Sequence, residues 1–133
     1  MQVREGMSDV VLTVGPTHTL REAAAMMTEK GIGAALVSDD ETPVPCIVTE
    51  RDILHSLGAG EDPDAERVAD HMSDSVIAAS PEWSLERAAT EMSRLGIRHL
   101  VVYDGPELVG VLSMRDIVRV WTSEGATSGM TPE

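Results

Sequence analysis

The chain has few aromatic side chains and few basic ones. Its 133 residues include only three aromatic residues, with no Phe: Trp83, Tyr103 and Trp121. The chain therefore lacks the aromatic platforms on which many nucleic-acid-binding proteins stack bases. The chain has ten Lys and Arg and 23 Asp and Glu, which gives a net charge of −13. Because phosphate-rich partners need a basic face, we expect neither nucleic acid nor an anionic membrane as a partner.

Cysteine and long apolar runs are also missing. Cys46 is the single cysteine, so no internal disulfide can form, and its apolar surroundings predict a buried thiol. No apolar stretch approaches 18 residues, so no transmembrane helix is expected. Residues 1–6 are polar and lack the apolar core of a signal peptide, which favours a cytoplasmic location. We predict no metal site, because no recurring ligand spacing links the histidines His18, His55, His71 and His99.

An internal repeat organises the residues that are present. The apolar share of 42% is enough for a packed core. When the sequence is shifted by 65 positions, residues 7–40 overlay residues 72–105, and the match resumes after a one-residue deletion. The aligned identities include Met7 with Met72, Pro16 with Pro81, Gly31 with Gly96 and Arg51-Asp52-Ile53 with Arg115-Asp116-Ile117. We therefore predict two copies of one supersecondary unit that bury their apolar faces against each other.

The first half of each copy predicts a strand followed by a helix. The apolar runs 10–12 and 76–78 predict the strands, and a proline ends each region. A helix follows, with Thr19 or Ser84 as its N-cap and apolar residues at i, i+3, i+4 and i+7. Thr19 and Glu22 fit a capping box. Gly31 and Gly96 end these helices, because glycine readily adopts the left-handed conformation.

The second half of each copy predicts two strands and a final helix. The strand pairs are 34–37 with 45–48, and 100–103 with 108–112. The final helices start at Thr49 and Ser113. The predicted fold is α/β (α+β), with the order β-α-β-β-α occurring twice. We assign repeat 1 to residues 7–57, a linker with a short helix to 58–71, repeat 2 to 72–121 and a flexible tail to 122–133.

These residues resemble a tandem pair of cystathionine-β-synthase (CBS) domains over about residues 7–121. The resemblance rests on Met-Ser-Asp at the start of each copy, on Gly-Ile after the first helix, and on the motifs Thr49-Glu50-Arg51-Asp52 and Ser113-Met114-Arg115-Asp116. It implies that the repeats pack with pseudo-two-fold symmetry into one module, which usually pairs as a homodimer. It also implies a regulatory role: clefts between repeats bind AMP, ADP, ATP or S-adenosylmethionine, and the signal passes to an effector protein.

The Ser/Thr-x-x-Asp motifs have two compatible interpretations. As capping boxes, they place a hydroxyl and a carboxylate at a helix N-terminus, where both bind backbone N–H groups. A carboxylate also suits a ribose diol, and a hydroxyl at a helix N-terminus suits a phosphate. The resemblance accordingly implies that Asp52 and Asp116 hold ribose, while Thr49 and Ser113 contact phosphate or ribose.

The two repeats differ next to these motifs. The resemblance implies that Arg98 and His99 neutralise a ligand phosphate, whereas the first repeat has the uncharged Gly33 and Ala34 at the same positions. A solvated arginine and a histidine satisfied within the fold are the structural alternative. Thr13 ends the first strand, where the resemblance places adenine. Arg115 faces either a phosphate or a neighbouring acid.

No nucleophile motif or Walker-type phosphate loop occurs in the sequence, so we predict a protein that is not an enzyme and has no catalytic cofactor. The alternative function is a ligand-free interaction or dimerisation module. It is favoured by the acidic charge and by the absence of a basic residue at Gly33 and Ala34.

Overall fold

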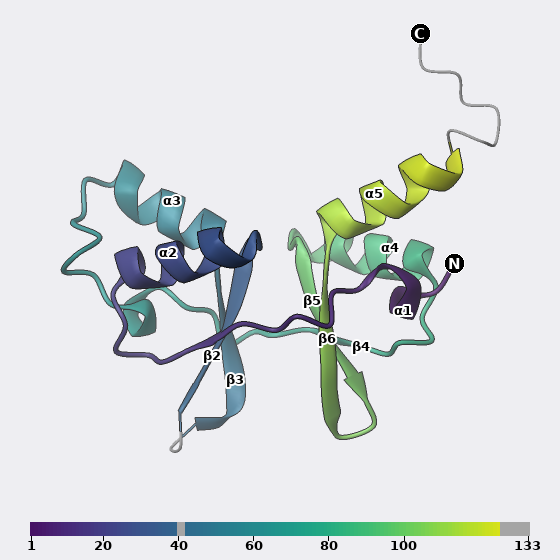
Figure 1. The fold of residues 1–133 in the computed structure, drawn as a ribbon, viewed down its shortest axis with the longest axis horizontal. Coiled ribbons are helices and arrows are strands. Elements are labelled where there is room, and N and C mark those ends of the chain that lie inside the picture. The colour runs from purple at the N-terminus through teal and green to yellow at the C-terminus, as the bar shows by residue number, and fades with distance from the viewer. Residues whose placement is uncertain (40–41, 126–133) are drawn as a thin grey trace, which may run out of the picture. The chain divides into compact units, whose positions relative to one another are not determined.

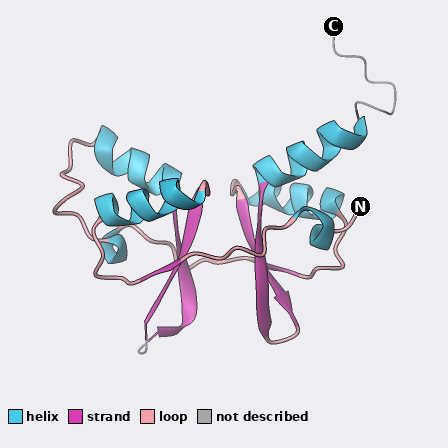
Figure 2. Ribbon diagram, viewed as in Figure 1, coloured by secondary structure: helices cyan, strands magenta, loops and turns pink. Residues whose placement is uncertain are grey.

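The computed structural model describes residues 1–39 and 42–125, which divide into two compact units. The first-repeat unit is Val11–Val76, and the second-repeat unit combines Met1–Val10 with the chain from Ile77 onward. Each unit contains a three-stranded sheet with helices packed on it, which confirms the predicted mixed α/β class (Figure 2). No helix in the described ranges is long and apolar enough to cross a membrane.

The first-repeat unit follows the predicted order of elements. Its sheet has the order β1-β2-β3, in which β1 is parallel to β2 and β2 is antiparallel to β3. Figure 1 labels β2 and β3 of this sheet and the helices α2 and α3 of the same unit. The helices α2 and α3 pack against this sheet, and a 3₁₀ turn, η1, follows in the connecting segment. The elements are β1 Thr13–Val14, α2 Leu20–Lys30, β2 Ala34–Asp39, β3 Thr42–Thr49, α3 Glu50–Gly58 and η1 Val68–Asp70.

Local signals determine where α2 begins and ends. The Thr19 hydroxyl accepts a hydrogen bond from the backbone N–H of Glu22, and the Glu22 carboxylate accepts one from the N–H of Thr19. Gly31 closes the helix with φ of 67°, a conformation that residues with a Cβ adopt at a cost. Leu20, Ala23 and Met27 share one helix face and are buried against the sheet. The predicted capping box and glycine stop are therefore confirmed.

The second-repeat unit repeats this pattern and adds a short helix. Its sheet order is β4-β5-β6, with the same parallel and antiparallel pairing. Gly96 ends α4 with φ of 68°, as Gly31 ends α2. The elements are α1 Val3–Gly6, β4 Ala78–Ala79, α4 Leu85–Leu95, β5 His99–Asp104, β6 Glu107–Ser113 and α5 Met114–Gly125.

The segment that opens each repeat lies on the sheet of the other repeat. Ser8 and Val111 exchange two backbone hydrogen bonds, of 2.9 and 3.0 Å, so residues 1–10 join the second-repeat unit. Ser73 and Ile47 exchange the equivalent pair, of 2.8 and 2.9 Å, in the first-repeat unit. The sequence alignment opens the repeats at Met7 and Met72, whereas contacts in the structure divide the chain after Val10 and Val76.

This exchange explains a shift of the first strands. The runs 10–12 and 76–78 were predicted as strands, but the ladders form at Thr13–Val14 and Ala78–Ala79. The preceding residues still belong to the other unit, so the chain reaches β2 only at Leu12, whose carbonyl accepts from the Leu36 N–H.

The C-terminal prediction also changes. The tail was predicted to begin at residue 122, but α5 continues through Gly125, and the Thr122 hydroxyl donates to the Val118 carbonyl one turn back. Residues 126–133 lie outside the described part of the chain.

The interior is aliphatic and contains most of the methionines. Met27 and Met92 are buried in the two cores, and Met7, Met26, Met72 and Met114 pack against them. Cys46 is 7% exposed and free, as the sequence predicts. Trp121 is 43% exposed, so it does not close the core.

Candidate functional site

The Thr49–Asp52 motif caps α3 in the first-repeat unit. Asp52 Oδ2 accepts hydrogen bonds from the Thr49 N–H (2.8 Å) and the Thr49 hydroxyl (3.0 Å). The Asp52 N–H donates to Thr49 Oγ1 at 3.3 Å. Both side chains are half-buried. These bonds confirm the capping interpretation, and they leave Asp52 Oδ1 outside the cap.

The Ser113–Asp116 motif repeats this cap at the start of α5. Asp116 Oδ2 accepts from the Ser113 N–H at 2.9 Å, and the Asp116 N–H donates to Ser113 Oγ at 3.0 Å. The second carboxylate oxygen, Oδ1, lies 3.3 Å from Arg119 Nη2, and the same guanidinium donates to the Gly6 carbonyl. Asp116 is therefore held from two directions, by its own cap and by an arginine tied to α1.

Arg98 and His99 lie beside the Ser113 motif of their own repeat. His99 pairs with Ser113 in the β5–β6 ladder, and the Met114 N–H donates to the Arg98 carbonyl at 2.8 Å. Arg98 is exposed at the strand start, and His99 is half-buried. Within the second-repeat unit, the motif that neighbours this basic pair is Ser113–Asp116.

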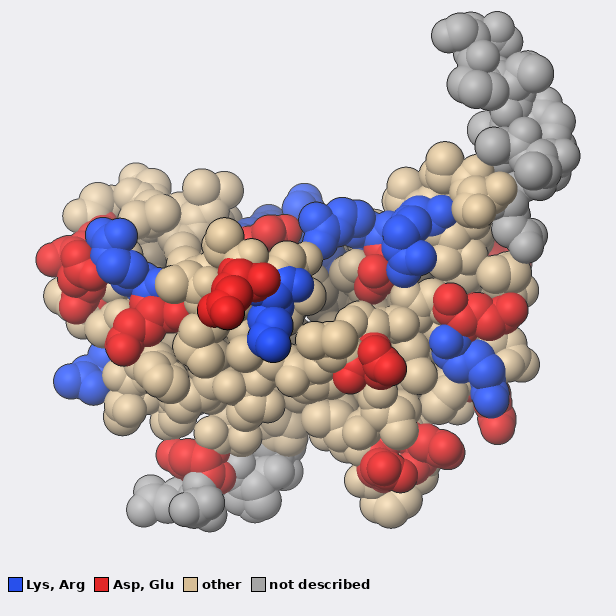
Figure 3. Space-filling view, in the orientation of Figure 1, with Lys and Arg blue, Asp and Glu red and all other residues tan. Residues whose placement is uncertain are grey.

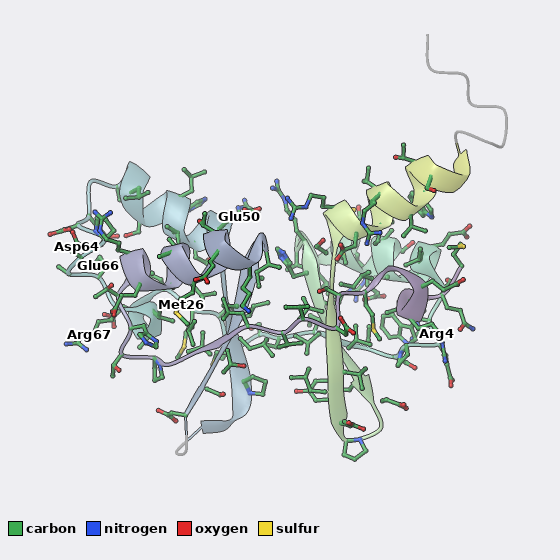
Figure 4. The ribbon with its side chains drawn as sticks, in the orientation of Figure 1. Arg4, Met26, Glu50, Asp64, Glu66 and Arg67 are labelled. Atoms are coloured by element: carbon green, nitrogen blue, oxygen red, sulfur yellow. The ribbon has the colours of Figure 1, made fainter. Side chains whose placement is uncertain are left out.

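The equivalent place in the first-repeat unit carries the opposite charge. Ala34 pairs with Thr49, and the Glu50 N–H donates to the Gly33 carbonyl at 2.9 Å, as Met114 does to Arg98. The Glu50 carboxylate lies over Gly33: a Cβ built on that glycine would meet Glu50 Oε1 at 2.9 Å. Figure 4 labels Glu50 at the start of α3. An acid thus occupies the space above the position where the other repeat has an arginine.

Sequence reasoning missed Glu50, although a signal was available. The aligned motifs read Thr-Glu-Arg-Asp and Ser-Met-Arg-Asp, so the acid occurs in one copy only. The glycine opposite it had been interpreted only as a missing charge. The two differences are coupled, because the glycine leaves room for the carboxylate.

Thr13 and Arg115 complete the predicted set. Thr13 is exposed on β1 and pairs with Leu36, two residues along β2 from Ala34. Arg115 is exposed in the first turn of α5, one residue before Asp116. In each unit, the residues that the sequence singled out therefore gather where the central strand starts and the last helix begins.

Comparison with known proteins gives this arrangement a family. The family profile described as CBS domain matches residues 2–59 and 68–123. The CBS domain-containing protein YhcV of Bacillus subtilis is 33% identical over 131 residues, which are 97% of this chain and 92% of that protein. A protein with CBS domains from Burkholderia ambifaria MC40-6 has a similar structure, with a TM-score of 0.84, 30% identity and full coverage of both chains.

A second solved structure contains a ligand. The CBS domain protein PAE2072 from Pyrobaculum aerophilum, complexed with AMP, matches with a TM-score of 0.77 and 32% identity, over 96% of this chain and 99% of that one. The duplicated sequence, the two sheets and these matches agree. The chain belongs to the CBS domain family and contains two copies of the domain in tandem.

Proposed function

We propose that the chain is a regulatory module that binds an adenosine-containing ligand and signals its level to an effector protein. One observation carries the proposal. Each unit places a capping carboxylate, Asp52 or Asp116, in the first turn of its last helix, beside the start of its central strand. The second unit adds Arg98. Carboxylates suit ribose hydroxyls, while helix N-termini and arginines suit phosphates. The AMP complex of the Pyrobaculum relative supports this ligand class.

The two repeats are proposed to bind unequally. Arg98 is exposed beside Ser113 and Asp116, so the second repeat offers a cation to a ligand phosphate. Glu50 covers the equivalent position in the first repeat and repels an anion there. We therefore assign the phosphate of AMP, ADP or ATP to the second repeat. A ligand without phosphate, such as S-adenosylmethionine, meets no such repulsion at the first.

Calorimetric titration of the whole protein with AMP, ATP and S-adenosylmethionine tests this assignment. Arg98→Ala removes the cation without touching a buried group, and we expect it to weaken AMP binding about 10-fold or more. The double variant with Asp116→Ala should weaken AMP binding further. Arg94→Ala is a matched control, because Arg94 is another exposed arginine of the same unit and pairs with Glu91 on α4. Equal AMP affinity in the Arg98 and Arg94 variants would remove the proposed site.

Self-association is the second part of the proposal. The last helices of both repeats expose large apolar residues at aligned positions, Leu54 and Leu57 on α3 and Val118 and Trp121 on α5. Such residues are enriched at protein interfaces. We propose a homodimer through these helices. Native mass spectrometry should show twice the chain mass, and Leu54→Glu with Val118→Glu should return the monomer.

The ligand-free interaction module remains the second candidate, and the same exposed residues favour it. A thermal-shift screen separates the candidates. A ligand at 100 times its dissociation constant adds about 2.7 kcal/mol to the free energy of unfolding. No shift with any adenosine compound, together with a dimer, would favour the second candidate.

A further inference from the structure

A cluster of two carboxylates and an imidazole lies outside the proposed adenosine site. Glu61, Glu66 and His71 all belong to the connector, which we define as residues 59–71 between α3 and the second repeat. One ligand atom from each side chain lies within 4.8 Å of the other two. His71 Nε2 is 2.7 Å from Glu66 Oε1 and 4.0 Å from Glu61 Oε1. Figure 4 labels Glu66 in this connector, and Figure 3 shows acidic side chains at the same end of the unit.

The charges of this cluster do not balance. Both carboxylates face one imidazole, so at least one negative charge is left over whether or not His71 is protonated. The His71 and Glu66 side chains are only 17% and 28% exposed, so water screens them incompletely. The two neighbouring acids have other partners: Asp64 pairs with Arg21, and Asp62 accepts a hydrogen bond from the Asp64 N–H. A divalent cation would neutralise the excess charge.

Hydrogen bonds fix the backbone that carries these three residues, and one of them orients the Glu61 side chain. The hydroxyl of Ser56, a residue that is 3% exposed, donates to Glu61 Oε1 at 2.8 Å. The Glu66 N–H donates to the Asp62 carbonyl, and the Glu66 carbonyl accepts from the N–H of Leu20. The His71 N–H donates to the carbonyl of the fully buried Val68. In metal sites, the carboxylates that bind the ion are commonly oriented by hydrogen bonds of this kind from neighbouring groups.

We infer that Glu61, Glu66 and His71 form a binding site for one divalent transition-metal ion. One imidazole nitrogen with two carboxylate oxygens is a donor set that suits Zn²⁺ or Mn²⁺ and leaves a position for water. In a tetrahedral site with bonds of about 2.0–2.2 Å, ligand atoms lie about 3.3 Å apart. The observed separations, from 2.7 Å to within 4.8 Å, bracket that value. Side-chain rotation is therefore enough to close the site around an ion.

Such an ion would link two ends of the connector. Glu61 follows α3 closely, and His71 directly precedes the opening of the second repeat. The sequence predicted no metal site, because no recurring ligand spacing links the histidines. The spacing of five between Glu61, Glu66 and His71, with no continuous helix between them, does not by itself bring the three together. The inference is independent of adenosine binding, because it uses none of the residues proposed for that ligand.

Titration of the metal-free, full-length protein with Zn²⁺ against a zinc-sensitive dye tests the inference. We expect one Zn²⁺ per chain. His71→Ala should weaken binding by about 100-fold and Glu66→Gln by about 10-fold, because losing a ligand costs at least as much as losing one of the outer hydrogen-bond partners, for which about 10- to 100-fold is typical. Ser56→Ala, which removes only the orienting hydroxyl, should weaken it less than Glu66→Gln. His55→Ala is the matched control, because His55 is an exposed histidine on α3 outside the cluster, and it should leave the affinity unchanged.

Two results would overturn the inference. The first is the absence of Zn²⁺ and Mn²⁺ binding by the wild-type protein, which would leave an ion pair only. The second is equal Zn²⁺ affinity in the Glu66→Gln and His55→Ala variants. Circular dichroism identifies any variant that fails to fold. Glu66→Gln preserves the side-chain volume, so it decides the question if His71→Ala is unfolded.

Discussion

At the scale of single residues, the two repeats share one backbone hydrogen bond but carry side chains of opposite charge beside it. The N–H of the residue after the capping hydroxyl donates to a carbonyl at the start of the central strand in both units. That N–H belongs to Glu50 in the first-repeat unit and to Met114 in the second, and the carbonyls belong to Gly33 and Arg98. Duplication has therefore kept the geometry while the charge has diverged.

This contrast predicts that the first repeat can be given the second repeat's charge. Gly33→Arg alone would press its Cβ against the Glu50 carboxylate, so the change is paired with Glu50→Met. If Arg98 binds phosphate, the double variant should raise the AMP stoichiometry measured by calorimetry from one to two per chain. Glu50→Met alone, which adds no cation, is the control. An unchanged stoichiometry in a folded double variant would contradict the unequal-repeat proposal.

The Thr19 capping box predicts a dependence of stability on pH. Hydrogen bonds from the Thr19 backbone, then from its side chain, lower the pKa of Glu22 below its ordinary value of 4.5. Because the folded state favours the charged carboxylate, its stabilisation is present above about pH 4.5 and is lost as the pH falls through the folded pKa. Glu22→Gln keeps a capping acceptor but cannot titrate. Its melting temperature should fall less between pH 6 and pH 3 than that of the wild type, and parallel falls would contradict the assignment.

At the scale of elements, the exchanged opening segments depend on close backbone approach. Gly110 on β6 faces residues 7 and 8, and a Cβ built on it would lie 2.6 Å from the Ser8 carbonyl oxygen. That carbonyl accepts a hydrogen bond from the Val111 N–H. A side chain at this glycine would therefore separate the segment from the strand that holds it.

Gly110→Ala is predicted to destabilise the second-repeat unit by about 1–3 kcal/mol, because the added methyl group meets backbone that cannot rotate away. Urea unfolding followed by circular dichroism, which reports on both units, measures the change. Gly58→Ala serves as the control, since nothing lies within 4 Å of the Cβ built on this last residue of α3. A cost no larger than that of the control would show that residues 7 and 8 are not tightly held.

The elements could be predicted from sequence where their signals are local. Thr19 and Gly31 mark the ends of α2 through contacts with residues a few positions away, and both predictions are confirmed. The pairing of Ser8 with Val111 joins residues far apart in the chain, and the polar Met-Ser-Asp segment has no periodicity that names its partner. Glu50 and His71 were missed for a related reason: their importance depends on what lies opposite them in space.

At the scale of the whole molecule, the aromatic residues report on one unit alone. Trp83, Tyr103 and Trp121 all belong to the second-repeat unit, and Arg87 stacks over the Trp83 ring with 3.8 Å from its guanidinium carbon to the ring centroid. Tryptophan fluorescence therefore follows the unfolding of this unit, whereas circular dichroism follows both. Coincident transitions would show that the two units unfold together.

The N-terminal segment is predicted to be essential to the second-repeat unit. Val3 is fully buried among Leu85, Leu112 and Ile117, so Val3→Ala should cost about 1.5–3 kcal/mol from lost burial and the cavity left behind. Val10→Ala is the matched control in the same segment, because Val10 is 51% exposed. The fluorescence transition should move to lower urea in the Val3 variant and stay in place in the control. Identical midpoints would contradict the assignment of residues 1–10 to this unit.

The exchange of opening segments between the repeats has a consequence for how such a chain arose. In a single ancestral copy, the last strand and the opening residues would both have lacked a backbone partner. Two separate copies could have supplied these partners by exchanging their opening segments. Gene fusion would then have joined such a domain-swapped dimer into one polypeptide.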